Sequence, residues 1–349
     1  MLGLGKRPRM PTSAPARPDA DTQRGARRST RWHSLDVLKG LALFAMVAHH
    51  FQKWAAGPVD GRFIGFEHYV VTDLAAPLFA VALGAAAVVV GARIESWRGA
   101  LAPGWRWGQI LLIGLAIDLA THDLAIRGTG VLPTLAILGA LVMLAVFLGL
   151  RSPAAWWAVA AMCAVLAVPA TDLAGDGVLV RLVAGPFALP VYGVFAGAGA
   201  AVACHGLGRA EHVLPLWRAA LGVLVVGLLA ATVAGGVVAP EGIWLPARYP
   251  GHLAFTLWGL VASFAIWGAA RWLLPGGSIV GDAVARAGRR TLNVFAAHFI
   301  VKIVLGRLDL LGELDTRAWG LATWLAVALV CLASTVPLRR TTAEVASSG

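Results

Sequence analysis

Long apolar segments recur along the whole chain and are separated by short connections that are polar or rich in Gly and Pro. Most segments approach the roughly 20 residues that an α-helix needs to cross the hydrocarbon core of a bilayer. They are continuously apolar, whereas the strands of a membrane barrel alternate. The pattern predicts ten membrane-spanning helices, at 35–52, 70–91, 106–121, 131–150, 154–172, 183–204, 217–238, 251–274, 291–307 and 318–338.

Composition agrees with this interpretation. The 349 residues are 58% hydrophobic and 13% charged, whereas a soluble domain carries about 25% charged residues. We therefore expect an all-α, polytopic membrane helix bundle of about ten transmembrane helices, forming one domain over residues 31–340. Residues 1–30 are rich in Arg, Pro, Ala and Ser and predict a disordered basic tail, and residues 341–349 form a second tail.

The net charge of +11 is distributed unevenly between the two sides of the predicted bundle. With the N-terminus inside, 20 Lys and Arg residues fall on that side and eight on the other, and Lys39 lies within the first span. This asymmetry follows the positive-inside rule and places both termini in the cytoplasm of a multi-pass plasma-membrane protein. Anionic lipid headgroups are the expected partners of the charge, and nucleic acid is not.

Ionisable residues collect at the outer ends of the predicted spans. Five of the nine histidines lie in this layer. Burial in a bilayer is costly, so such residues are functional candidates. The layer contains His49, His50, His68, Asp73, Asp118, His122, Arg248 and His252, and His298 lies at mid-depth in the ninth span. No set of His and Cys residues has the spacing of a zinc site, so we expect no metal. The three cysteines lie in apolar segments and are interpreted as small core residues without disulfides.

The first span carries the clearest polar pattern. Lys39 and His50 are 11 residues apart, which places them on one helix face about 16 Å apart along the axis. Asp36 shares that face. We interpret the face as a polar stripe from a cytoplasmic cation to an outer imidazole, facing the interior of the bundle or a water-filled path.

Each of these residues also has a purely structural interpretation. Asp36 would favour the positive end of the first helix, and Lys39 would extend to the cytoplasmic interface. Asp118 and His122 are one turn apart and would satisfy each other. The inner arginines would serve only as the topology signal.

The functional interpretation is acyl transfer across the membrane. Imidazole is a common general base or nucleophile near neutral pH, and guanidinium groups bind the phosphates of coenzyme A. The candidate phosphate-binding residues on the inner rim are Arg93, Arg98, Arg106, Arg286, Arg289 and Arg290.

Several segments resemble transmembrane acyltransferases. "SLDVLKGLALFAMVAHHF", residues 34–51, is similar to their first-helix signature, Leu-Asp-x-x-Arg-Gly followed by an apolar run. In the acyltransferase-3 family this Arg is followed, after ten intervening residues, by His. Lys39 and His50 have this spacing, with Lys in place of Arg.

Three further segments resemble the catalytic domain of the heparan-alpha-glucosaminide N-acetyltransferase family. These are "TDLAAPLFAVALGAA" at 72–86, "RYPGHLAFTLWGL" at 248–260 and "GRRTLNVFAAHF" at 288–299, where His298 matches the family's His. In that family the first helix tends to end in Asn where this chain has His50, and the catalytic His follows in the next loop. The resemblance therefore leaves His50 and His68 both open as the working base.

The leading hypothesis is an integral-membrane acyltransferase that moves an acyl group, acetyl above all, from acyl-coenzyme A to a sugar or other cell-envelope acceptor. His50 or His68 would deprotonate the acceptor or carry the acyl group, and Asp73 would orient the imidazole. Lys39, Arg93, Arg286, Arg289 and Arg290 would hold the donor. Asp118, His122, Arg248, His252 and His298 would contact the acceptor. Two alternatives remain open: a small-molecule or lipid transporter that uses the same polar path, and a catalytically silent assembly or polyprenyl-lipid-binding protein.

Overall fold

Helices are the only regular secondary structure in the described part of the chain. The computed structural model describes residues 32–55, 74–121, 130–170, 178–185, 187–209, 211–233, 253–295 and 297–298. Its helices are α2 (His33–Ala55), α4 (Ala75–Gly91), α5 (Trp97–Thr121), α6 (Val131–Phe147), α7 (Pro153–Ala170), α8 (Val178–Ala184), α9 (Leu189–Gly206), the 3₁₀ turn η2 (Glu211–Val213), α10 (Leu216–Val233), α11 (Leu253–Leu273) and α12 (Ile279–Arg289).

The all-α prediction is confirmed for these residues, whereas the ten membrane spans remain a prediction. Among the described helices, only α9 is both long and apolar enough to cross a bilayer by length and composition. Three further apolar stretches are shorter: α4, α6 and Pro153–Ala167 of α7. The predicted span at 318–338, most of the one at 291–307 and both predicted tails lie outside the described residues.

The core forms where α4 and α9 pack backbone to backbone. A Cβ atom at Gly84 would collide with the carbonyl oxygen of Ala196, and one at Gly199 would collide with that of Val81. Glycine at these positions therefore lets the two helices approach closely, as small residues do in membrane bundles. α6 packs on α4 and α7 packs on α9, so this pair is covered on both sides.

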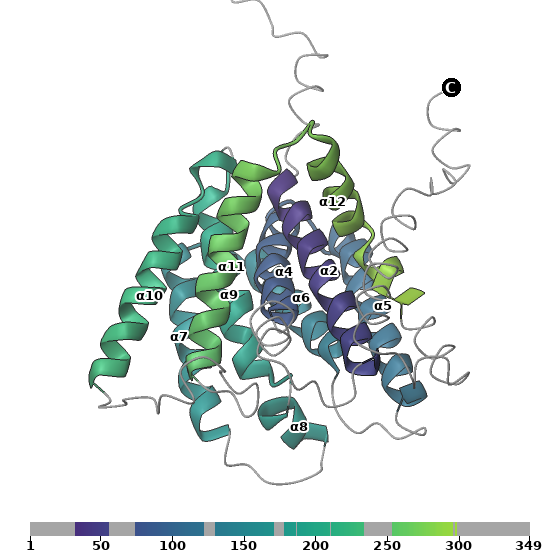
Figure 1. The fold of residues 1–349 in the computed structure, drawn as a ribbon, viewed down its shortest axis with the longest axis horizontal. Helices are drawn as coiled ribbons and strands as arrows, with labels where there is room; N and C mark the ends of the chain where they lie inside the picture. The colour runs from purple at the N-terminus through teal and green to yellow at the C-terminus, as the bar shows by residue number, and fades with distance from the viewer. Residues whose placement is uncertain are drawn as a thin grey trace, which may run out of the picture. The chain divides into compact units, whose positions relative to one another are not determined.

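Apart from the short α8, helices that follow one another in the described chain run in opposite directions, so short connections collect at one end of the helices (Figure 1). This end, called the basic end below, contains the α4–α5, α6–α7, α9–α10 and α11–α12 connections. Figure 1 shows the last two at the top of the view. In the described residues, every arginine except Arg181 lies at or toward the basic end. Most Lys and Arg residues of the predicted outer side lie outside the described residues, so the charge asymmetry between the two sides remains a prediction.

Two helix starts, those of α5 and α9, are notable departures from the sequence prediction. α5 begins at Trp97, nine residues before the predicted start, because the Ser96 hydroxyl accepts a hydrogen bond from the Gly99 N–H at 3.2 Å and caps the helix ahead of Pro103. The span predicted at 183–204 is instead α9, which starts at Leu189 with Pro190 in its first turn. The short α8 precedes it.

The predicted 275–290 connection contains the amphipathic helix α12. Ser278 caps this helix by accepting a hydrogen bond from the Gly281 N–H at 3.1 Å. Its buried face packs on α2, where Val284 and Ala285 join Val37 of α2 and Ala270 of α11 in one apolar cluster. The glycines of this connection suggested a loop, but Gly288 lies where α12 contacts the backbone of α2.

Hydrogen bonds hold the start of α2 against α11 and the α9–α10 connection. Trp267 is fully buried and donates its indole N–H to the Ser34 hydroxyl at 2.8 Å. The Ser34 backbone N–H donates to the Glu211 carboxylate at 3.0 Å. Arg271 donates to the Glu211 carbonyl oxygen at 3.1 Å. The first turn of α2 therefore has a defined position at the basic end.

The closest contact of α12 with α2 provides a stability test. A Cβ atom at Gly288 would collide with the carbonyl oxygen of Asp36, so Gly288→Ala must push the helices apart. We expect a loss of about 1–3 kcal/mol, as for other overpacked contacts, seen as a lower midpoint of thermal unfolding in detergent. Gly104→Ala on α5 is the matched control, because its Cβ meets no atom within 4 Å. Equal midpoints for the two variants would contradict the contact.

Candidate functional site

A buried carboxylate lies between two cations on the face of α2 that meets α12. The Asp36 side chain is 4% exposed, and one of its oxygens lies 2.7 Å from Lys39 Nζ. Its other oxygen lies 3.9 Å from Arg289 Nη1. Burying an ion in a protein interior is costly unless the ion is paired, and both carboxylate oxygens of Asp36 face a cation. Because one carboxylate faces two cations, this group retains a net positive charge.

A cavity of about 550 Å³ opens beside these cations. It is lined by α2, α4, α5, α6, α12 and the residues that follow α12. Lys39, Arg106 and Arg289 contribute the charged part of its wall. Apolar side chains form most of the remainder, among them Leu83, Ile110 and Leu135. Such a cavity suits a ligand with an anionic end and an apolar end.

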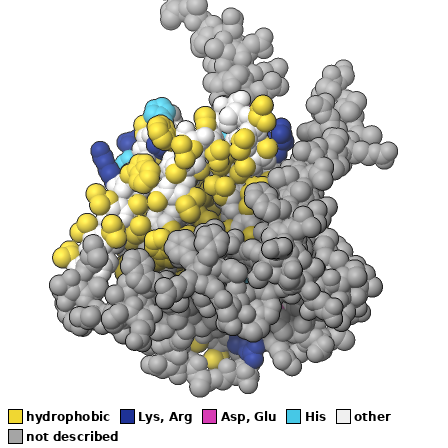
Figure 2. All heavy atoms as spheres, in the orientation of Figure 1, with side chains coloured by type: hydrophobic (Ala, Val, Ile, Leu, Met, Phe, Trp, Pro, Cys, Tyr) yellow, Lys and Arg dark blue, Asp and Glu magenta, His cyan; other side chains and the backbone are white. Residues whose placement is uncertain are grey.

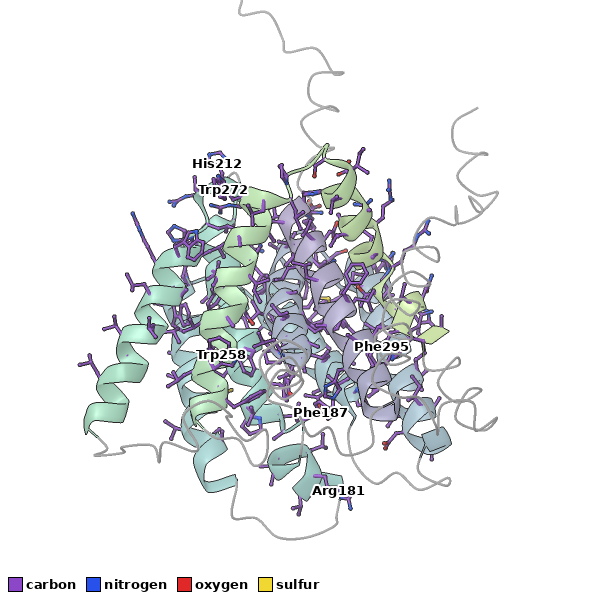
Figure 3. The ribbon with its side chains drawn as sticks, viewed as in Figure 1. Arg181, Phe187, His212, Trp258, Trp272 and Phe295 are labelled. Carbon is purple, nitrogen blue, oxygen red and sulfur yellow. The ribbon has the colours of Figure 1, made fainter. Side chains whose placement is uncertain are left out.

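The cavity extends from the basic end deep into the helices. Both Val90 and Phe79 line it, and these residues are 11 positions apart on α4. At 1.5 Å per residue, this separation corresponds to roughly 16 Å along the helix axis. Phe295 lines the cavity too, from the segment that descends after α12 (Figure 3).

A histidine pair lies directly behind Phe295. The Nδ1 atom of His50 is 2.8 Å from Nε2 of His298, and the two rings are parallel within 6° with centroids 5.0 Å apart. The Phe295 ring meets the His298 ring edge to face, with centroids 5.1 Å apart. Phe295 is 3% exposed and His298 is 5% exposed. One aromatic ring therefore separates the cavity from the histidine pair.

The hydrogen bond within this pair restricts its protonation. One nitrogen must carry the hydrogen and the other must present a lone pair, so the bond cannot persist when both rings are fully protonated. If His50 donates from Nδ1, its Nε2 keeps a lone pair that can accept a proton. His49 is buried beside the pair, with its ring centroid 5.8 Å from that of His50. The arrangement can therefore orient an imidazole as a base.

The structure brings together part of the predicted site. Lys39 and Arg289 line the cavity, and His50 and His298 form the pair. Arg93 and Arg286 are exposed at the basic end, and Arg290 is half-buried just after α12, but none of them is among the residues that line this cavity.

The acceptor-side predictions are described only in part. Asp118 is buried near the end of α5, at 6% exposure. The predicted residues that lie outside the described part of the chain are His68, Asp73, His122, Arg248 and His252.

The predicted polar stripe on α2 is interrupted. Between Lys39 and His50, the same helix face holds Leu43 and Met46, which are 0% and 5% exposed. The polar stripe is therefore not continuous along α2. The space that extends inward from Lys39 is instead the cavity beside α2, and its inner wall is largely apolar.

The sequence reasoning missed Phe295 as a site residue. Phe295 lies three positions before His298 in a helical segment, so both side chains occupy one face. That spacing could have indicated the contact. The pairing of His50 with His298 could not be found this way, because 248 positions separate the two residues.

Comparison with known proteins bears on the N-terminal part of this site. A search of curated proteins returned no match. A scan against protein families matched residues 31–186 to the model described as heparan-alpha-glucosaminide N-acetyltransferase, catalytic. The matched segment includes α2, α4, α5 and α6, which carry His50, Lys39 and much of the cavity wall. Residues 31–186 are therefore similar to the catalytic domain of this acetyltransferase family, and the expected resemblance of the segment at 72–86 lies within this match, whereas the segments at 248–260 and 288–299 lie outside it.

Proposed function

We propose that the protein is an integral-membrane acyltransferase that transfers an acyl group, acetyl above all, from acyl-coenzyme A to a sugar or other cell-envelope acceptor. The observation that carries this proposal is the position of Phe295, which contacts the histidine pair and lines a cavity with a cationic mouth. The family match supports acetyltransferase chemistry. The protein would be a multi-pass protein of the plasma membrane, with its basic end in the cytoplasm.

The cavity would hold the donor. Arg106, Arg289 and Lys39 would bind phosphate groups of coenzyme A by charge-assisted hydrogen bonds. The apolar interior would take the pantetheine arm and direct the thioester inward. A volume of about 550 Å³ lies within the usual range for small-molecule pockets, roughly 300–1,000 Å³.

The histidine pair would supply the base. His298 would accept a hydrogen bond from Nδ1 of His50, which leaves Nε2 of His50 to take the proton of the acceptor hydroxyl or amine. The acceptor oxygen or nitrogen would form a bond to the thioester carbonyl carbon as the carbon–sulfur bond breaks. Coenzyme A would leave as a thiolate and take up the proton. His68, followed five positions later by Asp73, is the alternative base that the family resemblance leaves open.

Removing the histidines should abolish most of the transfer. We expect His50→Ala to lower radiolabelled acetyl transfer by about 10²–10⁴-fold, the usual contribution of a general base. His298→Gln should lose less activity than His298→Ala, because a side-chain amide can still accept the hydrogen bond from His50.

The measurement uses purified protein in detergent with acetyl-coenzyme A as the donor. His212→Ala is the matched control, because His212 is exposed at the basic end (Figure 3). Full activity in both His50→Ala and His298→Ala would eliminate the pair as the base and leave His68 as the candidate.

Arg106 should act on donor binding. A charge-assisted hydrogen bond contributes about 1.5–3 kcal/mol to the free energy of binding. Arg106→Gln is therefore expected to raise KM for acetyl-coenzyme A by about tenfold to a hundredfold, with a smaller effect on kcat. Arg98→Gln, an exposed position on the same helix, is the control. The KM for S-acetylpantetheine, which lacks the phosphates, should not change. An equal rise for both donors would argue against phosphate binding by Arg106.

Phe295 should limit the acyl chain. Phe295→Ala removes the ring that forms part of the cavity wall next to His298, so longer acyl groups gain space there. We expect the ratio of butyryl to acetyl transfer to rise by about tenfold or more, the order expected for a methylene or two in an apolar pocket. Phe147→Ala, whose ring packs on Trp97, is the control. An unchanged ratio would mean that the acyl group does not reach Phe295.

A further inference from the structure

A second cavity, of about 630 Å³, lies away from the candidate site. It is formed by α7 and α9 on one side and by α10 and α11 on the other. This space is called the lateral groove below. Its walls are mainly apolar and include Trp157, Val202, Val226 and Leu260. None of the residues that line the lateral groove belongs to the histidine pair or to the first cavity.

The lateral groove exists because small residues line it on both sides. α7 contributes Ala160, Ala161 and Ala164, and α10 contributes Ala219 and Gly222. A Cβ atom at Gly222 would meet no atom within 4 Å. Apolar walls offer water few hydrogen bonds. An apolar chain is therefore a better occupant than water.

The basic end of the lateral groove is cationic. His205 and Arg218 line it there, and both are exposed. Arg209 lies nearby, with Nη1 3.4 Å from Nε2 of His205. At the other end the described lining residues are uncharged and include Val194, Thr256 and Leu257. The groove is therefore suited to an amphiphile with an anionic head at the basic end.

The length of the lateral groove corresponds to one leaflet of a bilayer. Val194 and His205 both line it and are 11 residues apart on α9, which corresponds to roughly 16 Å along the axis. The hydrocarbon core of a bilayer is about 30 Å thick, so one leaflet contributes about half of that.

The surface around the lateral groove is suited to lipid. Leu221 and Leu229 of α10 are 61% and 60% exposed, and Val165 of α7 is 70% exposed. Figure 2 shows an apolar surface on the side of the molecule where α10 and α11 lie, with Lys or Arg and His side chains at its upper edge. A soluble protein would rarely expose so many large apolar side chains together.

We propose that the lateral groove is a binding site for an anionic phospholipid of the leaflet at the basic end. One acyl chain fills the groove between α7 and α10, and the phosphate accepts hydrogen bonds from the Arg218 guanidinium and from Nδ1–H of His205, whose Nε2 accepts from Arg209. The proposal rests on the membrane location proposed above and is independent of the acetyl-transfer reaction.

The test measures lipid retention by native mass spectrometry. Purified, delipidated protein is mixed with phosphatidylglycerol or with phosphatidylcholine of the same acyl chains. The wild type should retain phosphatidylglycerol about tenfold more strongly than phosphatidylcholine. The phosphatidylglycerol headgroup carries a net negative charge that the cations at the basic end of the groove attract. Equal retention of the two lipids would overturn the proposal.

Two variants locate the lipid. Gly222→Leu fills the groove, so it should lower phosphatidylglycerol retention about tenfold or more. Gly108→Leu on α5 is the matched control, because its Cβ also meets no atom within 4 Å and it lies outside both cavities. Arg218→Gln should reduce the preference for phosphatidylglycerol.

If Gly222→Leu retains as much phosphatidylglycerol as Gly108→Leu, the lipid binds elsewhere and the proposal fails. Because retention needs no coenzyme A and no acceptor, a failure of acetyl transfer would leave this result unaffected.

Discussion

The packing of α2 against α12 and the segment after it is the constraint on which the candidate site depends. Gly288 meets the backbone of Asp36, and Gly40 meets that of Val284, so neither position has room for a side chain. This contact places Arg289 beside Asp36, the partner of Lys39, at one end and His298 beside His50 at the other. Two segments about 250 residues apart in sequence therefore pack together to form the candidate site.

The same contact separates charge from apolar space. The cations that share Asp36 lie at the mouth of the cavity, and the interior between α4, α5 and α6 is apolar. Charges at the mouth remain close to water, where desolvation costs little, while their field extends into a region of low dielectric constant. A polyanionic ligand is thus attracted at the mouth, and its apolar part has space further in.

Sequence reasoning predicted the helices and the ends of the polar face, because both depend on local patterns. Apolar runs of adequate length mark most helices, and the spacing of Lys39 and His50 places them on one face of α2. It missed α12, since the Gly and Pro residues at 275–281 are typical of a loop, and only the packing on α2 shows why Gly288 has no side chain. It also predicted a continuous polar stripe on α2, whereas Leu43 and Met46 on that face are buried. Helical periodicity shows which face a residue occupies and does not show what packs against that face.

Phe295 has a consequence for the membrane itself. Its ring lies between the cavity and the histidine pair, with little exposure to solvent. If the donor enters from one side and the acceptor from the other, the thioester and the acceptor would have to meet beside this ring, and its apolar bulk would hinder the passage of ions. The electrochemical gradient across the bilayer would then be preserved through each turnover, which an open aqueous channel between the two faces would not allow.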